Sequence, residues 1–247
     1  MVSRLRCFIG GILFCFFTSS FALHATENDD LVKAMMEVYA EELAANPQDY
    51  RTYYSRAMAY FGQGDMKKAL SDIDNAIKYF PRKEKDDLAQ AYLLRAKILS
   101  ERGETKSALT DLNSALRLVP NHRLALKDRG DLLCRLGQYD MAKIDYNHLL
   151  RMDTRSQSAF MGLARVEAHT GQPVRAKDLL AQAVNLSPKD PKIYLERSEI
   201  YKEMDMMPEA VDDLVYAVSL DDGHSGAIQK PVSYTHLRAH ETEADLV

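Results

Sequence analysis

Three kinds of residue recur along the chain at a nearly constant interval. Alanines stand at 69, 108, 142, 176 and 210, glycines at 64, 103, 137 and 171, and prolines at 47, 81, 120 and 188. The interval is 34 residues, or twice 34, except for one interval of 39 in each series. All three series therefore place one insertion of five residues between Pro81 and Ala89, within the charged stretch 82–87. A fixed period of this length predicts a stack of similar units.

Each unit has the pattern of two helices joined by a turn. Five units begin at Tyr50, Ala89, Arg123, Gln157 and Pro191. The fourth position is aromatic or Leu in every unit (Tyr53, Tyr92, Leu126, Phe160, Tyr194), and the eighth is small (Ala57, Ala96, Gly130, Ala164, Ser198). This spacing is helical, and small residues let two helices approach closely. A glycine at the fifteenth position suits the left-handed residue that ends a helix.

The segments "YYSRAMAYFGQGDMKKALSDIDNAIKYFP" and "AYLLRAKILSERGETKSALTDLNSALRLVP" resemble the tetratricopeptide repeat, a two-helix unit of 34 residues. The resemblance covers roughly residues 30–230. It implies an all-α protein, a right-handed α-solenoid of about five helix-turn-helix repeats with an N-terminal capping helix at 26–49. The repeats are expected at 50–81, 89–122, 123–156, 157–190 and 191–222.

The fourth repeat departs most from this pattern. Glu167 stands where the other repeats have Tyr or Leu, and just before this repeat Thr154 replaces the terminal proline of the third one. We therefore expect looser packing around Glu167.

A pair of opposite charges recurs within the repeats. Arg stands at the seventh position and Asp at the twenty-third in four repeats, as Arg56 with Asp72, Arg95 with Asp111, Arg129 with Asp145, and Arg197 with Asp213. In the fourth repeat both become Leu, at 163 and 179. This joint change predicts an ion pair between the two helices of one repeat, because an unpaired buried charge is costly. The alternative is a row of arginines that binds ligand carboxylates.

The resemblance also implies a ligand groove. One repeat cannot bury its own apolar face, so neighbours stack, and in the family the first helices line a concave groove. Carried onto this sequence, the partner-binding residues are expected to be Tyr54, Met58, Phe61, Leu93, Lys97, Lys127, Asp131 and Arg165. The first four form an apolar cluster that suits an apolar anchor, and the rest are mostly basic. A partner with a hydrophobic segment followed by an acidic one would fit.

The apolar cluster has a second interpretation. Tyr54 and Phe61 could instead pack against the N-terminal helix. The family's carboxylate clamp needs Lys and Asn at set groove positions. Tyr54 and Met58 occupy those places in the first repeat, so the sequence does not support a clamp.

Composition and motifs exclude several function classes. The formal net charge is −4, and nothing supplies the basic stripe that binds nucleic acid. The chain has no Gly-rich phosphate loop, HExxH or CxxC motif. His236 and His240 have helical spacing but no third ligand nearby, and Cys134 has no obvious activating base. We therefore expect no catalytic site, metal or cofactor.

The N-terminus has the pattern of a signal peptide at 1–25. Arg4 and Arg6 precede an apolar run, Cys7–Phe17, and small residues follow it. The alternative is a membrane anchor, but the run is shorter than the ~20 residues that a spanning helix needs. The sequence thus predicts a periplasmic or secreted protein, in a bacterial envelope, with no stable membrane span after cleavage.

The C-terminus breaks the repeat pattern. Residues 223–231 fit the start of a truncated sixth repeat, and "SYTHLRAHET" within 232–247 resembles a translated sequencing adaptor, so we expect a non-native tail there. The leading hypothesis is a scaffold of the cell envelope that binds a protein or peptide. The alternatives are the regulatory or targeting part of a longer enzyme truncated at the C-terminus, and a periplasmic chaperone of the holdase type.

Overall fold

The computed structural model describes the backbone of residues 23–221 and the side chains of 31–220. Within this range the chain forms eleven α-helices and no strand, as the all-α prediction requires. It divides into two compact units, the first ending at Tyr79 and the second beginning at Phe80. The predicted signal peptide as far as residue 22, the predicted sixth-repeat start and the predicted tail lie outside the described residues.

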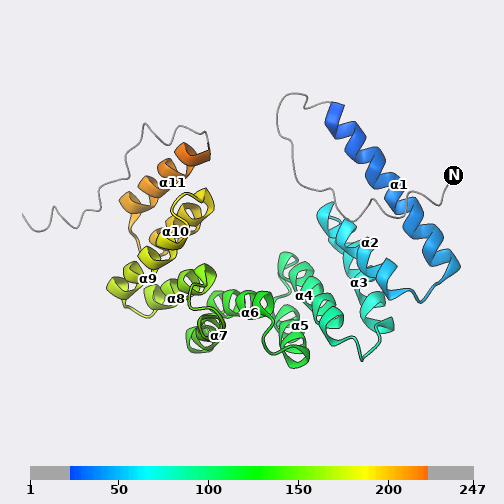
Figure 1. Ribbon diagram of the computed structural model, residues 1–247, viewed down its shortest axis with the longest axis horizontal. Helices are drawn as coiled ribbons and strands as arrows, with labels where there is room; N and C mark the ends of the chain where they lie inside the picture. The colour runs from blue at the N-terminus through cyan, green and yellow to red at the C-terminus, as the bar shows by residue number, and fades with distance from the viewer. Residues whose placement is uncertain (1–22, 222–247) are drawn as a thin grey trace, which may run out of the picture. The chain divides into compact units, whose positions relative to one another are not determined.

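The first unit contains α1 (Leu23–Ala45), α2 (Tyr50–Gly62) and α3 (Met66–Tyr79). α2 and α3 form the first helical pair, and α1 packs against α2 (Figure 1). The Thr52 hydroxyl on α2 donates a hydrogen bond of 2.9 Å to the Glu42 carboxylate on α1. A helix is thus present where the sequence predicts an N-terminal one, although it begins and ends earlier than the expected range 26–49.

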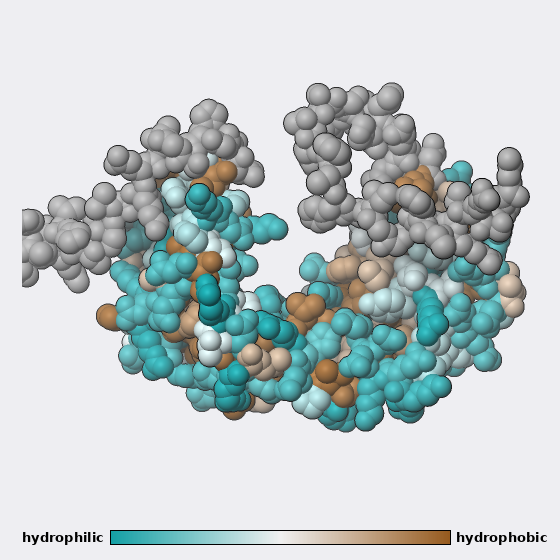
Figure 2. Space-filling model, viewed as in Figure 1, coloured by the Kyte–Doolittle hydropathy of each residue, from teal (hydrophilic) through white to brown (hydrophobic). Residues whose placement is uncertain are grey.

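The second unit contains four more helical pairs. Its helices are α4 (Lys85–Glu101), α5 (Thr105–Leu118), α6 (Arg123–Arg135), α7 (Tyr139–Met152), α8 (Gln157–His169), α9 (Pro173–Leu186), α10 (Pro191–Glu203) and α11 (Met207–Asp221). Each pair packs tightly within itself, and the second helix of a pair contacts the first helix of the next, as α5 contacts α6 and α7 contacts α8. Hydrophilic residues cover most of the described surface in Figure 2, with separate apolar patches between them.

The core of the second unit is built where successive pairs meet. Leu180 and Val184 on α9 belong to one cluster with Ile193 and Ile200 on α10, and all four are at most 2% exposed. The second helix of one pair thus depends on the first helix of the next to cover its apolar side. This is the mutual covering on which a repeat array depends for its stability.

The turns within the pairs follow the glycine series. Gly64, Gly103, Gly137 and Gly171 have φ between +70° and +78°, in the left-handed region where only glycine is free of strain. Asp205 takes the same place in the fifth pair, with φ of 57°. The predicted role of the fifteenth position is therefore confirmed, and Asp replaces Gly there once.

The five-residue insertion lengthens a helix. The second repeat was expected to begin at Ala89, but α4 begins four residues earlier, at Lys85, and runs for 17 residues. Asp86 and Asp87 lie in its first turn, where negative charge interacts favourably with the helix dipole. The charged stretch 82–87 therefore supplies an extra helical turn in addition to the connection.

Candidate partner-binding face

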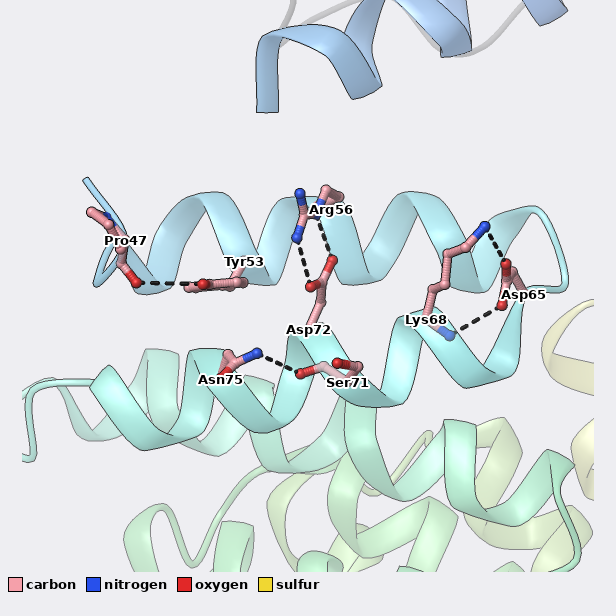
Figure 3. A network of polar contacts seen from close by, with 8 residues as sticks. All are labelled: Pro47, Tyr53, Arg56, Asp65, Lys68, Ser71, Asp72 and Asn75. Atoms are coloured by element: carbon pink, nitrogen blue, oxygen red, sulfur yellow. Dashed lines mark hydrogen bonds and ion pairs between the residues drawn. The ribbon is translucent and has the colours of Figure 1, made fainter. Parts of the chain in front are cut away.

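The four predicted Arg–Asp pairs are present, and each joins the two helices of one pair. Arg Nε donates to Asp Oδ2 at 2.6 Å in Arg56–Asp72, 2.7 Å in Arg95–Asp111, 2.8 Å in Arg129–Asp145 and 2.6 Å in Arg197–Asp213. A second bond runs from Nη2 to Oδ1 in each pair. Figure 3 shows both bonds between Arg56 on α2 and Asp72 on α3. Bidentate pairs of this kind fix geometry as well as charge.

The guanidinium groups of these arginines also contact other side chains, in the same repeat or in the preceding one. The guanidinium carbon of Arg56 lies 5.8 Å from the ring centre of Tyr53, and Arg197 lies 5.3 Å from that of Tyr194. Arg129 has Leu126 in place of an aromatic residue, and its Nη1 donates instead to Asn113 on α5, at 2.8 Å. The guanidinium groups therefore already hold an aspartate together with a ring or an amide. This favours the structural interpretation over a row of ligand-binding arginines.

The fourth repeat buries a different charge. Glu167 on α8 is only 3% exposed. Its carboxylate accepts a hydrogen bond of 2.8 Å from Lys143 on α7, and Arg175 on α9 lies 3.5 Å away. The looser packing expected around Glu167 is thus not found, because cations from two neighbouring helices compensate the buried carboxylate.

In the first unit, the predicted groove residues differ in accessibility. Met58 is 51% exposed, and Tyr54 and Phe61 are half-buried. Leu93 on α4 was expected in the same accessible cluster, but it is a core residue and only 3% exposed. In α4 the buried side of the helix is wide and includes Leu93 together with its neighbours Leu94 and Ala96, so it extends to a position that the repeat pattern places in the groove.

In the second unit, each predicted groove cation has a carboxylate partner. Lys127 donates to Asp131 at 2.7 Å, and Arg165 lies 3.1 Å from Glu203 on α10. Lys97 on α4 lies 3.9 Å from Asp128 on α6. The positive side chains of the predicted groove in the second unit are consequently balanced by carboxylates, whereas the sequence predicted a mostly basic groove.

Burial and charge act against each other at this face. Burial lowers the pKa of the Lys127 ammonium, but Asp131, Asp128 and Glu196 outweigh burial, and the pKa is raised. Burial raises the pKa of the Asp128 carboxyl, against the effect of Lys97 and Lys127. Lys127 therefore stays charged, and its field stabilises the carboxylates around it.

A buried tyrosine on α7 contacts Asp131 from the side of the helical pair that faces away from solvent. Tyr146 on α7 is fully buried, and its hydroxyl donates to Asp131 at 2.6 Å. Its ring lies against Gly130 on α6 and Gly162 on α8, where an added Cβ would overlap the ring. Cys134 Sγ lies 3.8 Å from the same hydroxyl, and burial raises the pKa of this thiol. Cys134 is therefore a poorly ionised thiol, which argues against a nucleophile.

A shallow polar surface cavity, widely open to solvent, lies between the starts of α6 and α8 and the middle of α10. Its volume is about 360 Å³, and it is lined by Arg123, Asp153, Arg155, Ser156, Gln157, Ser158 and Glu196. Leu124, next to Arg123, is 50% exposed, and Leu195, next to Glu196, is 44% exposed. We call Lys97, Leu124, Lys127, Asp131, Arg165 and Leu195, together with this cavity, the first-helix face.

Sequence reasoning missed several residues of this face. Asp128 directly follows Lys127, an expected groove residue, and Glu196 stands at the same sixth position in its own repeat, while Glu203 stands at the thirteenth. That adjacency was a usable signal. The buried Tyr146 gave no such signal, since its position is Ile or Leu in the other repeats.

No group of three His, Cys, Asp or Glu side chains that could hold a metal occurs in the described part of the chain. Nor does any helix there combine the length and apolar character needed to cross a membrane.

Known proteins agree with this architecture. A crystal structure of a tetratricopeptide repeat protein from Parabacteroides merdae is 26% identical, with a TM-score of 0.67, and covers 78% of this chain and 75% of that one. The C-terminal part of a repeat-containing protein from Cytophaga hutchinsonii has 17% identity and a TM-score of 0.59, with 81% and 78% covered. YrrB, described as a repeat protein with an unusual peptide-binding site, has 17% identity and a TM-score of 0.52, with 75% and 93% covered.

Sequence comparison identifies the family. No curated protein matches the chain. The family model for the tetratricopeptide repeat matches residues 54–123 and 127–191, more than half of the sequence. With five two-helix units in the described part, the chain belongs to the tetratricopeptide repeat family.

Proposed function

We propose that this protein is a non-catalytic scaffold of the cell envelope that binds a partner protein or peptide on its first-helix face. Proteins of this family are generally interaction scaffolds, and the fold is typically non-catalytic. The signal-peptide pattern of the N-terminal sequence supports the envelope location.

The observation that carries the proposal is that exposed leucines and a polar cavity occur on the same first helices. Leu124 on α6 and Leu195 on α10 are half exposed, and the residues that adjoin them in sequence, Arg123 and Glu196, line the cavity of about 360 Å³. Binding sites combine apolar contact area with a few polar groups that fix orientation. The first-helix face has both.

The charge balance of the first-helix face indicates which charge a bound segment should carry. Lys127 and Arg165 are already paired with Asp131 and Glu203, so an acidic segment would have to displace those carboxylates. A segment with apolar side chains and mixed or no charge fits better than the acidic one that the sequence suggested. Apolar anchors supply most of the binding energy in such interfaces.

Affinity capture with the full-length protein tests this. We expect the double variant Leu124→Ala and Leu195→Ala to retain less than a fifth of the partner that the wild type captures from an envelope extract. Val174→Ala, at a 74% exposed position on α9, is the matched control and should capture normally. Equal capture by the double variant would refute this face as the site, and the variant Tyr54→Ala with Phe61→Ala would then test the first unit.

The location is tested separately. Residues 1–30 fused to a reporter that is active only outside the cytoplasm should give activity, and Leu13→Arg within the apolar run should abolish it. A silent wild-type fusion would contradict the envelope assignment without bearing on partner binding.

A further inference from the structure

The five-residue insertion lies where the chain divides into its two compact units. The first unit ends at Tyr79, and the insertion follows Pro81. The connection itself is ordinary, because the Glu84 amide donates to the Pro81 carbonyl oxygen at 3.0 Å, in an i to i+3 turn that also precedes α6, α8 and α10. What is added is the first turn of α4, residues 85–88, which has no counterpart at the start of any other first helix in the described part.

A repeat array depends on coupling between neighbours. Its stability is approximately the sum of what each repeat contributes and of the interfaces between adjacent repeats. The junctions after the second, third and fourth repeats keep the 34-residue spacing, and the shared core of α9 and α10 shows the interface that this spacing gives. The added turn changes the spacing once, by about 6 Å of helix. The first unit is thus the one part of the array that is joined to the rest with a different spacing.

The first unit has a sparse core of its own. α2 buries two residues and α3 four, whereas α4 alone buries eight. Ile73 is the only large apolar side chain of α2 and α3 that is fully buried, and Leu43 is the only buried residue among the described side chains of α1. A segment with few buried apolar side chains opens at a low free energy.

Polar contacts hold the three helices of this unit in place. The Arg56–Asp72 clamp joins α2 to α3, and the bond from Thr52 to Glu42 joins α2 to α1. Such contacts fix geometry, but their net contribution to stability is small. Arrays of this kind need about three repeats for stability, and the first unit contains one repeat and α1.

We infer that the insertion divides the array into two units that unfold independently, so that α1–α3 open and close as one segment while α4–α11 stay folded. The apolar cluster of Tyr54, Met58 and Phe61 shares one side of α2 only when that helix is formed, because its residues are spaced by four and three. Opening of the first unit therefore removes this surface and leaves the first-helix face intact. This conformational device goes beyond the function proposed above.

Native-state hydrogen exchange of the full-length protein, followed by mass spectrometry in increasing urea, tests the inference. The amides of α1–α3 should lose protection together, at a urea concentration at which those of α4–α11 keep theirs. In the absence of urea, α2 and α3 should exchange at least tenfold faster than α6 and α7. Loss of protection in both units at the same urea concentration would overturn the inference.

Two variants test whether the insertion is the cause. Deletion of residues 82–86 restores the 34-residue spacing, so all helices should then lose protection over one range of urea concentration. The matched control places the same five residues, RKEKD, after Pro120 and should make α4–α5 lose protection separately from α6–α11. Circular dichroism shows whether the deletion variant is folded, and the wild type and the control decide the question if it is not. An unchanged pattern in the control would mean that the insertion does not divide the array.

Discussion

The pairs α6–α7 and α8–α9 are neighbours in the same unit, yet they place their buried charge differently. In α6–α7, Asp145 is 2% exposed and is held by Arg129 of the same pair. In α8–α9, that clamp is replaced by two leucines, and the buried carboxylate is Glu167, whose hydrogen bond comes from Lys143 on α7. The first arrangement ties together two helices of one repeat. The second ties one repeat to the next.

The comparison shows that the array does not need a clamp in every repeat. A buried ion pair roughly offsets its own desolvation, so a well-packed apolar pair can replace it, whereas breaking it leaves a buried charge without compensation. The two positions can therefore change only together. A charge placed between repeats has another effect, because it strengthens the coupling of neighbours rather than the stability of one unit.

The largest expected effect comes from breaking one clamp in α6–α7. Asp145→Leu should lower the free energy of unfolding by about 3–5 kcal/mol, because Arg129 stays behind without its aspartate. Adding Arg129→Leu imitates the fourth repeat and should recover most of that loss. Urea unfolding followed by circular dichroism measures both. A double variant no more stable than the single one would show that the clamp cannot be exchanged for leucines.

An intermediate effect is expected where the two pairs meet. Gly162→Ala places a Cβ against the buried ring of Tyr146 and should cost about 2 kcal/mol through overpacking. Tyr146→Leu, which restores the residue type found in the other repeats, should reduce that cost when combined with Gly162→Ala. The thermal midpoints of the two single variants and the double variant are the measurement. Additive losses would contradict the proposed contact.

The smallest effect is expected at the charge between the repeats. Glu167→Gln should cost about 1 kcal/mol, less than loss of the clamp, because the side chain of Lys143 is 37% exposed and can be hydrated. In this variant, amide hydrogen exchange should become faster than in the wild type where α7 and α8 meet, whereas exchange in α4–α5 should stay the same. Faster exchange only inside α9 would mean that Arg175 is the main partner of Glu167.

The repeat architecture and the clamps could be predicted because they are periodic. Arg and Asp recur at fixed positions, and their joint replacement at Leu163 and Leu179 identifies the contact without a structure. The left-handed turn residues follow from the glycine series in the same way. Asp205 departs from that series and still adopts positive φ, since Asp tolerates this conformation better than most residues.

The features that could not be predicted depend on residues that occur once. Glu167 was expected to loosen the local packing because its partner could not be recognised. Lys143 lies 24 residues earlier, at a position that carries no matching charge in most other repeats. The burial of Leu93 was missed because the repeat pattern assigns its position to the groove, whereas in α4 it is one of eight buried residues. Lys127 and Asp131 lie four residues apart on one helix, so this pair could have been predicted from the sequence. The pairing of Arg165 with Glu203 depends on which side chains meet across helices, and single-sequence patterns do not contain that information.

Glu203 has a consequence for how the array opens. Its carboxylate lies 3.1 Å from Arg165 and 3.2 Å from His169, both on the preceding first helix, so the fourth and fifth repeats share a junction. Glu167 joins the third and fourth repeats in the same manner. In a linear chain of units, coupling between neighbours favours joint melting over local opening. The two junctions add to the apolar packing between the last three repeats, so a guest bound to one of these repeats should also slow proteolysis of its neighbour.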